Sequence, residues 1–381
     1  MIRVLLLIDS ASEFDRKLLR GIVRYSKENG PWLFYRLPSY FRWEVDGENK
    51  VMEWVQQWKP SAIIGRWGDR QVERLGELNI PIVLQNYRKR SSVYSNITGD
   101  YLGTGAMAAE FFARRLFRNY AFFGVRGVVW SDERREGFRR EVERRGGNFY
   151  LLEVDRPESE IHSEVARWLH DLPKPVALFC CDDAHALVIS EACKRENISI
   201  PNDIALLGVD NDDLICNISD PPISSIGLEV ERGGYTVGQL LHQRILSGSC
   251  EPFSVVINPV HIEQRQSTER HNIENPYIGR VVKYIEEHFE AELTIEQLAE
   301  LIPLSRRSLE LKFKEEMRTT IYQYIMSCRI ERFTHLLITT DRTLADIAIE
   351  AGFRDCNNIS RVFKKFKGCT PLEYRLRNRI L

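Results

Sequence analysis

The chain has 381 residues, of which 43% are hydrophobic and 28% charged, and its 53 basic and 54 acidic side chains give a formal net charge of −1. At roughly 150 residues per domain, this length predicts two or three folded domains. The composition excludes global disorder, collagen and coiled-coil rods. No apolar run approaches the roughly 18–20 residues of a membrane span. The apolar start is too short for a secretory signal core and runs directly into Asp9, so we expect a cytoplasmic protein.

The eight cysteines form no Cys-x-x-Cys pair and no Cys/His cluster with zinc spacing. We therefore expect reduced cysteines and neither a metal nor a cofactor. Asp182-Asp183 and Asp212-Asp213 are acidic pairs that could hold a cation, but no His or Glu at ligand spacing supports such a site.

Residues 1 to about 265 alternate short apolar runs with longer amphipathic ones. The runs predict strands at Val4–Ile8, Leu33–Leu37, Ala62–Ile64, Ile82–Leu84, Val93–Thr98, Tyr120–Phe123, Tyr150–Val154, Val176–Phe179, Ala205–Val209 and Ser254–Ile257. Helices are predicted between them, at Asp15–Glu28, Lys50–Trp58, Arg70–Leu78, Tyr101–Arg115, Asp132–Arg145, His162–Leu169, Ala184–Glu196 and Val230–Leu246. Two such series predict an α/β domain of two lobes, each with a parallel sheet covered by helices, and a cleft between the lobes.

The pattern changes near Gln264. Residues 266–276 are polar and non-periodic, which predicts a linker between a domain over 1–265 and an all-helical domain over 277–381. The helical tail is locally basic: Arg354–Leu381 holds eight basic and two acidic residues. This distribution suits a polyanionic partner.

Two helix-turn-helix patterns lie in the tail. In the first, Thr294 and Gln297 have capping-box spacing, and Ser305 is placed to cap the second helix. The helical period buries Leu309, Phe313 and Met317 and exposes Arg307, Glu310 and Lys314 on the other face.

In the second pattern, Gly352 supplies the turn. The helix that follows is predicted to bury Ile359, Val362, Phe363 and Phe366 and to expose Asn357, Arg361, Lys364 and Lys365. Asn can read adenine, Arg can read guanine, and Lys suits phosphates. The alternative is that both polar faces are only solvated surface.

Residues 347–375 carry a specific motif, Ile347-Ala348-x3-Gly352-Phe353-x5-Ile359-Ser360-Arg361-x-Phe363-Lys364-Lys365-x2-Gly368-x-Thr370-Pro371-x2-Tyr374-Arg375. It resembles the signature of the AraC-type transcription regulators. The resemblance implies two recognition helices in successive major grooves of operator DNA, which are about 34 Å apart. It implies base contacts by Arg307, Glu310, Cys356, Asn357 and Arg361, and phosphate contacts by Arg306, Lys364 and Lys365. Lys314 and Asn358 complete the predicted DNA-binding set. Pro303 stands where this family usually has Gly, and Ile359 where it usually has Phe.

In the first domain, polar side chains follow several predicted strands, and ligands bind beyond such strand ends. An uncharged polyol needs hydrogen-bond acceptors for its hydroxyl groups, a bidentate hydrogen-bond donor and an aromatic ring that stacks on its C–H face. Asp9, Asp182 and Asp210 could accept, Arg134 could donate, and Phe14, Trp67 or Trp130 could stack. The alternatives are helix caps for the aspartates, a solvated face for Arg134 and core positions for the tryptophans.

This domain resembles the periplasmic-binding-protein-like sensor of the LacI/GalR regulators. The matching pieces are Asp100-x2-Gly103, Glu133-Arg134-x2-Gly137-Phe138, Phe179-x2-Asp182-Asp183-x2-Ala186-Leu187, and Ile200-Pro201-x-Asp203-Ile204-x3-Gly208-Val209-Asp210-Asn211. The resemblance implies effector contacts by Arg134, Asp182 and Asp210, with Asp182 standing where Asn is commoner. Such a sensor followed by an AraC-type tail resembles the XylR group of sugar-operon activators. That group implies D-xylose or another pentose as effector, a homodimer, and RNA polymerase as a further partner.

Two other readings stay open. The first is an α/β enzyme that acts on a sugar and carries a helical appendage, although no dinucleotide-binding, P-loop or G-x-S-x-G motif supports it. The second is a DNA-binding protein whose lobes serve only for dimerisation.

Overall fold

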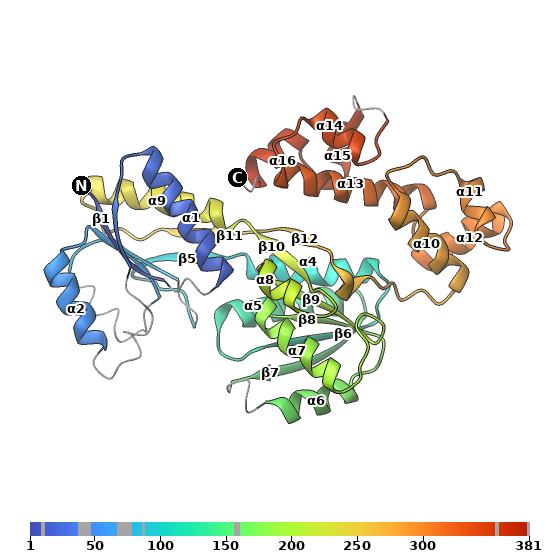
Figure 1. Cartoon of the computed structure of the whole chain (residues 1–381), viewed down its shortest axis with the longest axis horizontal. Coiled ribbons are helices and arrows are strands. Elements are labelled where there is room, and N and C mark those ends of the chain that lie inside the picture. The colour runs from blue at the N-terminus through green and yellow to red at the C-terminus, as the bar shows by residue number, and fades with distance from the viewer. Residues whose placement is uncertain are drawn as a thin grey trace. The chain divides into compact units, whose positions relative to one another are not determined.

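The computed structural model describes residues 1–8, 12–36, 47–66, 78–85, 88–155, 161–354 and 358–378. The chain divides into two compact units. The first comprises Met1–Glu110 and Arg118–Glu269, and the second comprises Phe111–Phe117 and Arg270–Leu381. The first unit holds two α/β lobes, and the second is helical (Figure 1). The predicted fold class is therefore confirmed.

The first lobe is a parallel sheet in the order β11-β5-β4-β3-β1-β2. Its strands are β1 (Arg3–Leu7), β2 (Leu33–Arg36), β3 (Ala62–Gly65), β4 (Ile82–Leu84), β5 (Ser95–Gly99) and β11 (Ser254–Ile257). Helices α1 (Glu13–Glu28), α2 (Gly47–Trp58) and α9 (Val230–Ser247) flank it. Leu5 and Leu7 pack with Val55 of α2, so the alternate residues Val4 and Leu6 point to the opposite face.

The second lobe has the order β12-β10-β9-β8-β6-β7, parallel except for the antiparallel β12. Its strands are β6 (Asn119–Val125), β7 (Asn148–Val154), β8 (Val176–Cys180), β9 (Ile204–Val209), β10 (Ser224–Leu228) and β12 (Pro259–Glu263). Its helices are α4 (Tyr101–Arg114), α5 (Val129–Arg144), α6 (His162–Asp171), α7 (Asp183–Arg195) and α8 (Asp213–Ile218). Phe179 contacts Phe138 of α5, whereas Leu178 packs in the cluster that contains Val165 of α6 and Ile189 of α7. Helices therefore cover both faces of the sheet.

The sequence reading missed three of these elements, β10, β12 and α8. The predicted helix at Arg70–Leu78 lies almost wholly outside the described residues.

In both sheets the strand order reverses beside the first strand: β1 lies between β2 and β3, and β6 lies between β7 and β8. Parallel sheets bind ligands outside the carboxyl ends of the strands at such a switch point.

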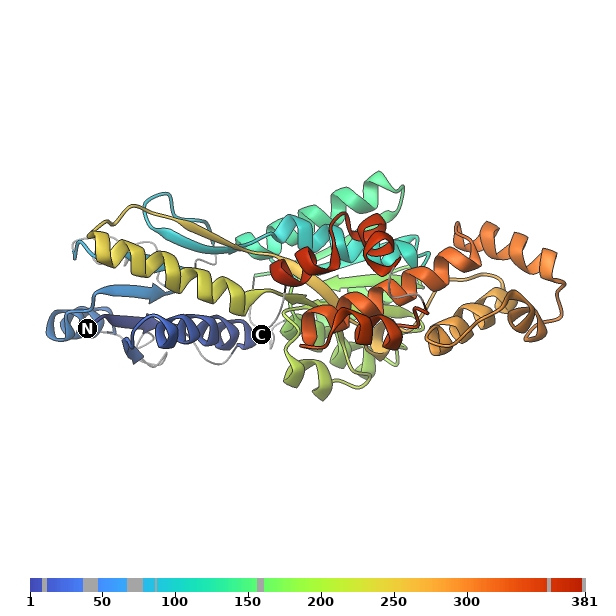
Figure 2. The same ribbon diagram turned by 90° about the horizontal axis from the view of Figure 1, so that it is seen from above.

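Glycines allow close helix crossings in both lobes. At the α1–α9 crossing, a Cβ on Gly21 would lie 1.9 Å from the carbonyl oxygen of Glu231, and the two helices run side by side (Figure 2). At the α4–α5 crossing, a Cβ on Gly137 would lie 2.1 Å from the carbonyl oxygen of Leu102. Because backbone cannot move aside as a flexible side chain does, both positions require glycine.

The helical unit contains α10 (Pro276–His288), α11 (Ile295–Glu300), α12 (Arg306–Met317), α13 (Ile321–Thr339), α14 (Leu344–Glu350), α15 (Ile359–Lys367) and α16 (Pro371–Asn378). It has two apolar cores, and α13 contributes Ile325 to the first and Phe333 to the second. This helix has 19 residues, a length of about 28 Å. One continuous helix therefore sets the spacing between the two helix-turn-helix units.

The local signals in the first helix-turn-helix unit behave as predicted. Thr294 and Gln297 form a capping box, and the Ser305 side chain accepts a hydrogen bond from the Ser308 amide. The predicted core residues Leu309, Phe313 and Met317 are buried.

Among the described residues, no helix is both long and apolar enough to cross a membrane.

In the second unit, Gly352 has a φ of +84°, the left-handed conformation that a glycine turn supplies. Ile359 and Phe363 are buried and Val362 is partly buried, but Phe366 is 44% exposed, so its predicted burial was wrong. Phe366 lies in the last turn of α15, and the core cluster beneath that helix does not extend to it. Helical period identifies the buried face but not how far along the helix a partner covers it.

We predict that Gly137→Ala lowers the free energy of unfolding by about 1–3 kcal/mol, because the added methyl group forces α4 and α5 apart. Gly279→Ala is the control. A Cβ at Gly279 in α10 meets only Ile273 Cγ2 at 4.0 Å, so the helix should gain about 0.5–1 kcal/mol. Urea unfolding of the full chain measures both changes. Equal stability of Gly137→Ala and the unsubstituted protein would contradict the close crossing.

Candidate functional site

Arg134 lies at the centre of a polar cluster in the second lobe. Helix α5 begins at Val129 rather than at the predicted Asp132, and Arg134 follows in its second turn with 3% of its surface exposed. The guanidinium Nη1 donates to the Cys181 carbonyl at 2.5 Å, and Nη2 lies 3.7 Å from Asp210 Oδ1. The structure thus brings together the ends of β8 and β9 around one buried cation.

Two aromatic rings flank this cation. The ring centroids of Tyr101 and Trp130 lie 5.4 Å and 5.6 Å from Arg134 Cζ. Trp130 stands one helical turn before Arg134, which explains why α5 places both at the site. Sequence reasoning missed Tyr101, although it follows Asp100 in a motif piece that was noticed. Asp100 itself caps α4, its Oδ1 accepting from the Gly103 amide at 2.8 Å.

Asp210 follows β9 in a strained conformation, with a φ of +100°. Non-glycine residues rarely adopt such angles, and strain of this kind clusters at functional sites. Lys17 Nζ of α1 donates to the carbonyls of Asp210 and Asn211, at 3.1 Å and 3.2 Å. Burial raises the pKa of Asp210, while the nearby Arg134 charge opposes the rise.

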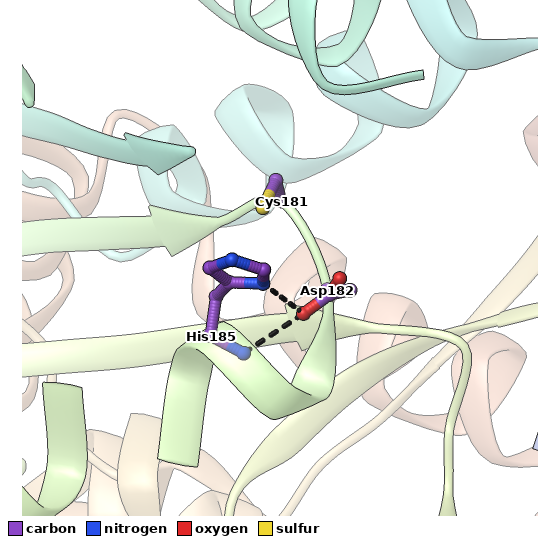
Figure 3. Close-up of side chains that lie close together, drawn as sticks. All are labelled: Cys181, Asp182 and His185. Carbon is purple, nitrogen blue, oxygen red and sulfur yellow. Dashed lines mark hydrogen bonds and ion pairs between the residues drawn. The ribbon is translucent and has the colours of Figure 1, made fainter. Parts of the chain in front are cut away.

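Asp182 is the N-cap of α7. Its Oδ1 accepts from the His185 amide at 2.8 Å and pairs with His185 Nδ1 at 2.7 Å. Figure 3 shows the other carboxylate oxygen pointing away from the imidazole. Burial acts to raise the pKa of Asp182, but the charge and hydrogen bonds of His185 outweigh it, and the pKa falls. Burial acts to lower the pKa of His185, but Cys181 and Asp182 outweigh it and raise the pKa well above its usual range.

Asp183 has a different role from its neighbour. It is buried, and its carboxylate accepts from Ser225 Oγ at 2.6 Å and from the Asp212 amide at 2.8 Å. A Cβ on Gly208 would lie 2.2 Å from its Oδ1. Asp183 therefore ties together the ends of three neighbouring strands, β8, β9 and β10.

Ion pairs near this cluster join the two lobes. Arg90, which donates to Thr98 of β5 at 2.9 Å, also pairs with Glu133 of α5 at 2.5 Å. Arg16 of α1 lies 3.4 Å from Asp212. Phe14, on the first turn of α1, is partly buried. The predicted effector residues Asp9 and Trp67 lie outside the described residues.

Two surface hollows lie away from this cluster. One is between α5 and β7, lined by residues that include Arg135 and Leu151. The other runs along α1 and is lined by residues that include Arg20 and Arg24. Neither contains Arg134, Asp182 or Asp210, so the candidate site rests on the convergence of these side chains and on their place at the strand ends.

The predicted DNA-binding residues of α12 share one exposed face, namely Arg306, Arg307, Glu310 and Lys314. Arg306 pairs with Glu296, and its Nε lies 3.5 Å from Glu310, so these predicted DNA contacts also bind each other. On the second unit Arg361, Lys364 and Lys365 are exposed on α15, and Asn358 is exposed just before it. Cys356 and Asn357 lie outside the described residues.

Two family models match the chain. A periplasmic binding protein-like domain matches residues 109–268, and a helix-turn-helix domain matches residues 298–377. The xylose operon regulatory protein of Escherichia coli (strain K12) is 28% identical over 98% of this chain and 96% of its own. The protein of the same name from Haemophilus influenzae is 26% identical over 98% of both chains.

A solved structure is similar along the whole chain. The xylose-binding transcription activator XylR superposes with a TM-score of 0.60 at 25% identity, over 99% of this chain and 98% of that one. Fold, site and comparisons define a transcription regulator in which a periplasmic-binding-protein-like sensor is joined to a C-terminal helix-turn-helix domain of the AraC type. Within that class, the chain is an XylR-like regulator rather than an enzyme.

We predict that Arg361→Ala weakens specific operator binding by about 1–3 kcal/mol, because the family resemblance implies that this arginine reads a base edge. Lys364→Ala should instead reduce the salt dependence of binding by about one counterion. Lys283→Ala is the control, since this exposed lysine lies on α10 outside both helix-turn-helix units. Fluorescence anisotropy at several salt concentrations measures all three. Unchanged operator affinity in Arg361→Ala would contradict the placement of the second recognition helix.

Proposed function

We propose that the chain activates sugar-catabolism genes in response to D-xylose or another pentose bound between the lobes of its sensor. The convergence of Arg134, Asp182 and Asp210 at the carboxyl ends of β8 and β9 carries this proposal. Similarity to xylose operon regulatory proteins over 98% of the chain supports it.

The site has the chemical groups that a small polyol needs. Asp182 offers an oxygen that points away from His185, Asp210 offers a second acceptor, and Arg134 donates. Arg134 Nε is buried and has no hydrogen-bond partner among the described residues. A buried donor without an acceptor is unfavourable, so an effector hydroxyl oxygen would satisfy it. Trp130 offers an apolar face for the C–H side of a sugar.

The contacts between the lobes provide a way for the effector to act. Lys17 holds the backbone of Asp210 from α1, and Arg90 holds Glu133, the residue beside Arg134. A sugar that binds Asp210 and Arg134 would change the free energy of these contacts. It shifts the protein toward the state that binds it more tightly, by no more than its difference in affinity for the two states.

At the DNA, we propose that α12 and α15 enter successive major grooves. The exposed residues that are predicted to contact bases and phosphates lie on both helices, with Arg307 on α12 and Arg361 on α15. We further propose that the protein is a cytoplasmic homodimer whose sensor supplies the dimer contacts. In this arrangement RNA polymerase is the partner recruited at the promoter, and the boundary between the domains lies within 266–276.

We predict that Arg134→Ala weakens xylose binding at least about thirtyfold, since truncating one member of a buried, hydrogen-bonded charge pair costs about 2 kcal/mol or more. Operator affinity without sugar should stay unchanged. Arg140→Ala is the matched control, because Arg140 is an exposed arginine on the same helix. Isothermal titration calorimetry gives the sugar affinities. Equal sugar affinity in Arg134→Ala and Arg140→Ala would contradict the placement of Arg134 in the effector site, whereas no sugar binding by the unsubstituted protein would favour lobes that serve only for dimerisation.

The choice of sugar has its own test. A sugar at 100 times its Kd stabilises the folded protein by about 2.7 kcal/mol, which raises the melting temperature measurably. We expect this increase with D-xylose or a related pentose in a panel of pentoses and hexoses. If no sugar in the panel shifts the melting temperature or gives heat on titration, the pentose assignment fails.

A further inference from the structure

The junction between β8 and α7 brings together three side chains that are each good ligands for a metal ion. A sulfur, a carboxylate oxygen and an imidazole nitrogen, from Cys181, Asp182 and His185, all lie within 4.8 Å of one another. Figure 3 shows the Cys181 sulfur on the side of the imidazole, with the Asp182 carboxylate beside it. Sequence reasoning expected no metal here because it found no zinc spacing among the cysteines and no His or Glu at ligand spacing, and so overlooked His185, three residues after Asp182.

Local structure explains why these three residues meet. Strand β8 ends at Cys180, and Asp182 caps α7. A capping residue and the third residue of its helix lie side by side, which places His185 against Asp182. Cys181 stands between strand and cap, and it is fully buried. All three donors thus lie within five residues of a rigid strand-to-helix junction, so little order has to be created on binding.

The donor types select the class of ion. Magnesium and calcium prefer oxygen ligands only, whereas a thiolate with an imidazole and a carboxylate suits zinc and cobalt. Three protein ligands leave the fourth position of a tetrahedral ion open. Arg134 contacts this junction through the Cys181 backbone carbonyl and lies 3.7 Å from Asp210 Oδ1, so its guanidinium pairs with none of the three proposed ligand atoms.

We propose that Cys181, Asp182 and His185 form a zinc-binding site that shares Asp182 with the effector. The consequence for the sensor rests on the proposed function: zinc and sugar compete for one carboxylate. Zinc at ten times its Kd would then lower the apparent sugar affinity about elevenfold, by simple mass action. The sensor would report sugar only when free zinc is low.

Cobalt tests the site directly, because a thiolate bound to cobalt(II) gives a strong near-ultraviolet charge-transfer absorption. Titration of the full chain in metal-free buffer should produce this band and saturate at one equivalent. Cys181→Ala should abolish the band, and His185→Gln should weaken cobalt binding more than about tenfold, the loss typical of even outer-shell changes. Cys250→Ser, which alters an exposed cysteine elsewhere, should keep the band and the affinity.

Two outcomes would overturn the site: no charge-transfer band at stoichiometric cobalt, or a band that persists in Cys181→Ala. Circular dichroism checks that each variant is folded. If Cys181→Ala unfolds, His185→Gln decides, since its partly exposed side chain can be replaced with less effect on the core. Sugar titration in metal-free buffer is a separate arm. Sugar binding without cobalt binding rejects the metal site alone, and cobalt binding without sugar binding rejects the proposed effector alone.

Discussion

A buried guanidinium with few protein partners organises the sensor. Moving such a cation out of water costs several kcal/mol unless its surroundings compensate. Arg134 receives that compensation from the Cys181 carbonyl, the Asp210 carboxylate 3.7 Å away and two aromatic rings. These groups come from the ends of two strands and the starts of two helices, so the charge fixes their spacing. Its Nε is buried and has no acceptor among the described residues, so this donor is left unsatisfied by the protein.

The backbone next to this cluster is strained. Asp210 stands at a φ of +100°, and such strain persists only where neighbouring structure imposes it. Asp183 supplies that constraint, since its buried carboxylate binds Ser225 of β10 and the amide of Asp212. The two adjacent aspartates after β8 thus have different structural roles. Asp183 fixes the strand ends from inside, and Asp182 presents an oxygen outward beside His185.

Sequence patterns predicted those structural features that depend on interactions between residues close together in the chain. The alternation of strands and helices, the capping box at Thr294 and the buried stripe through Phe313 need only neighbours in the chain. Strand β10 was missed because Ser224 and Ser225 break its apolar run; both are buried through hydrogen bonds to residues more than 40 positions away. The placement of Tyr101 over Arg134 likewise depends on how α4 crosses α5, which no local pattern encodes. Arg134, Asp182 and Asp210 were named from the chemistry that a polyol needs and from a family resemblance, and their convergence around one cation emerges only in three dimensions.

Under the proposed function, a sugar held by the sensor and operator DNA held by the helical domain influence each other through one chain. Thermodynamic linkage makes this measurable, because each ligand must change the affinity of the other by the same factor. The decisive measurement is the affinity for D-xylose with and without saturating operator DNA, together with the operator affinity with and without saturating D-xylose. Two equal ratios that differ from one are the predicted result. An operator affinity that saturating sugar leaves unchanged would contradict the account.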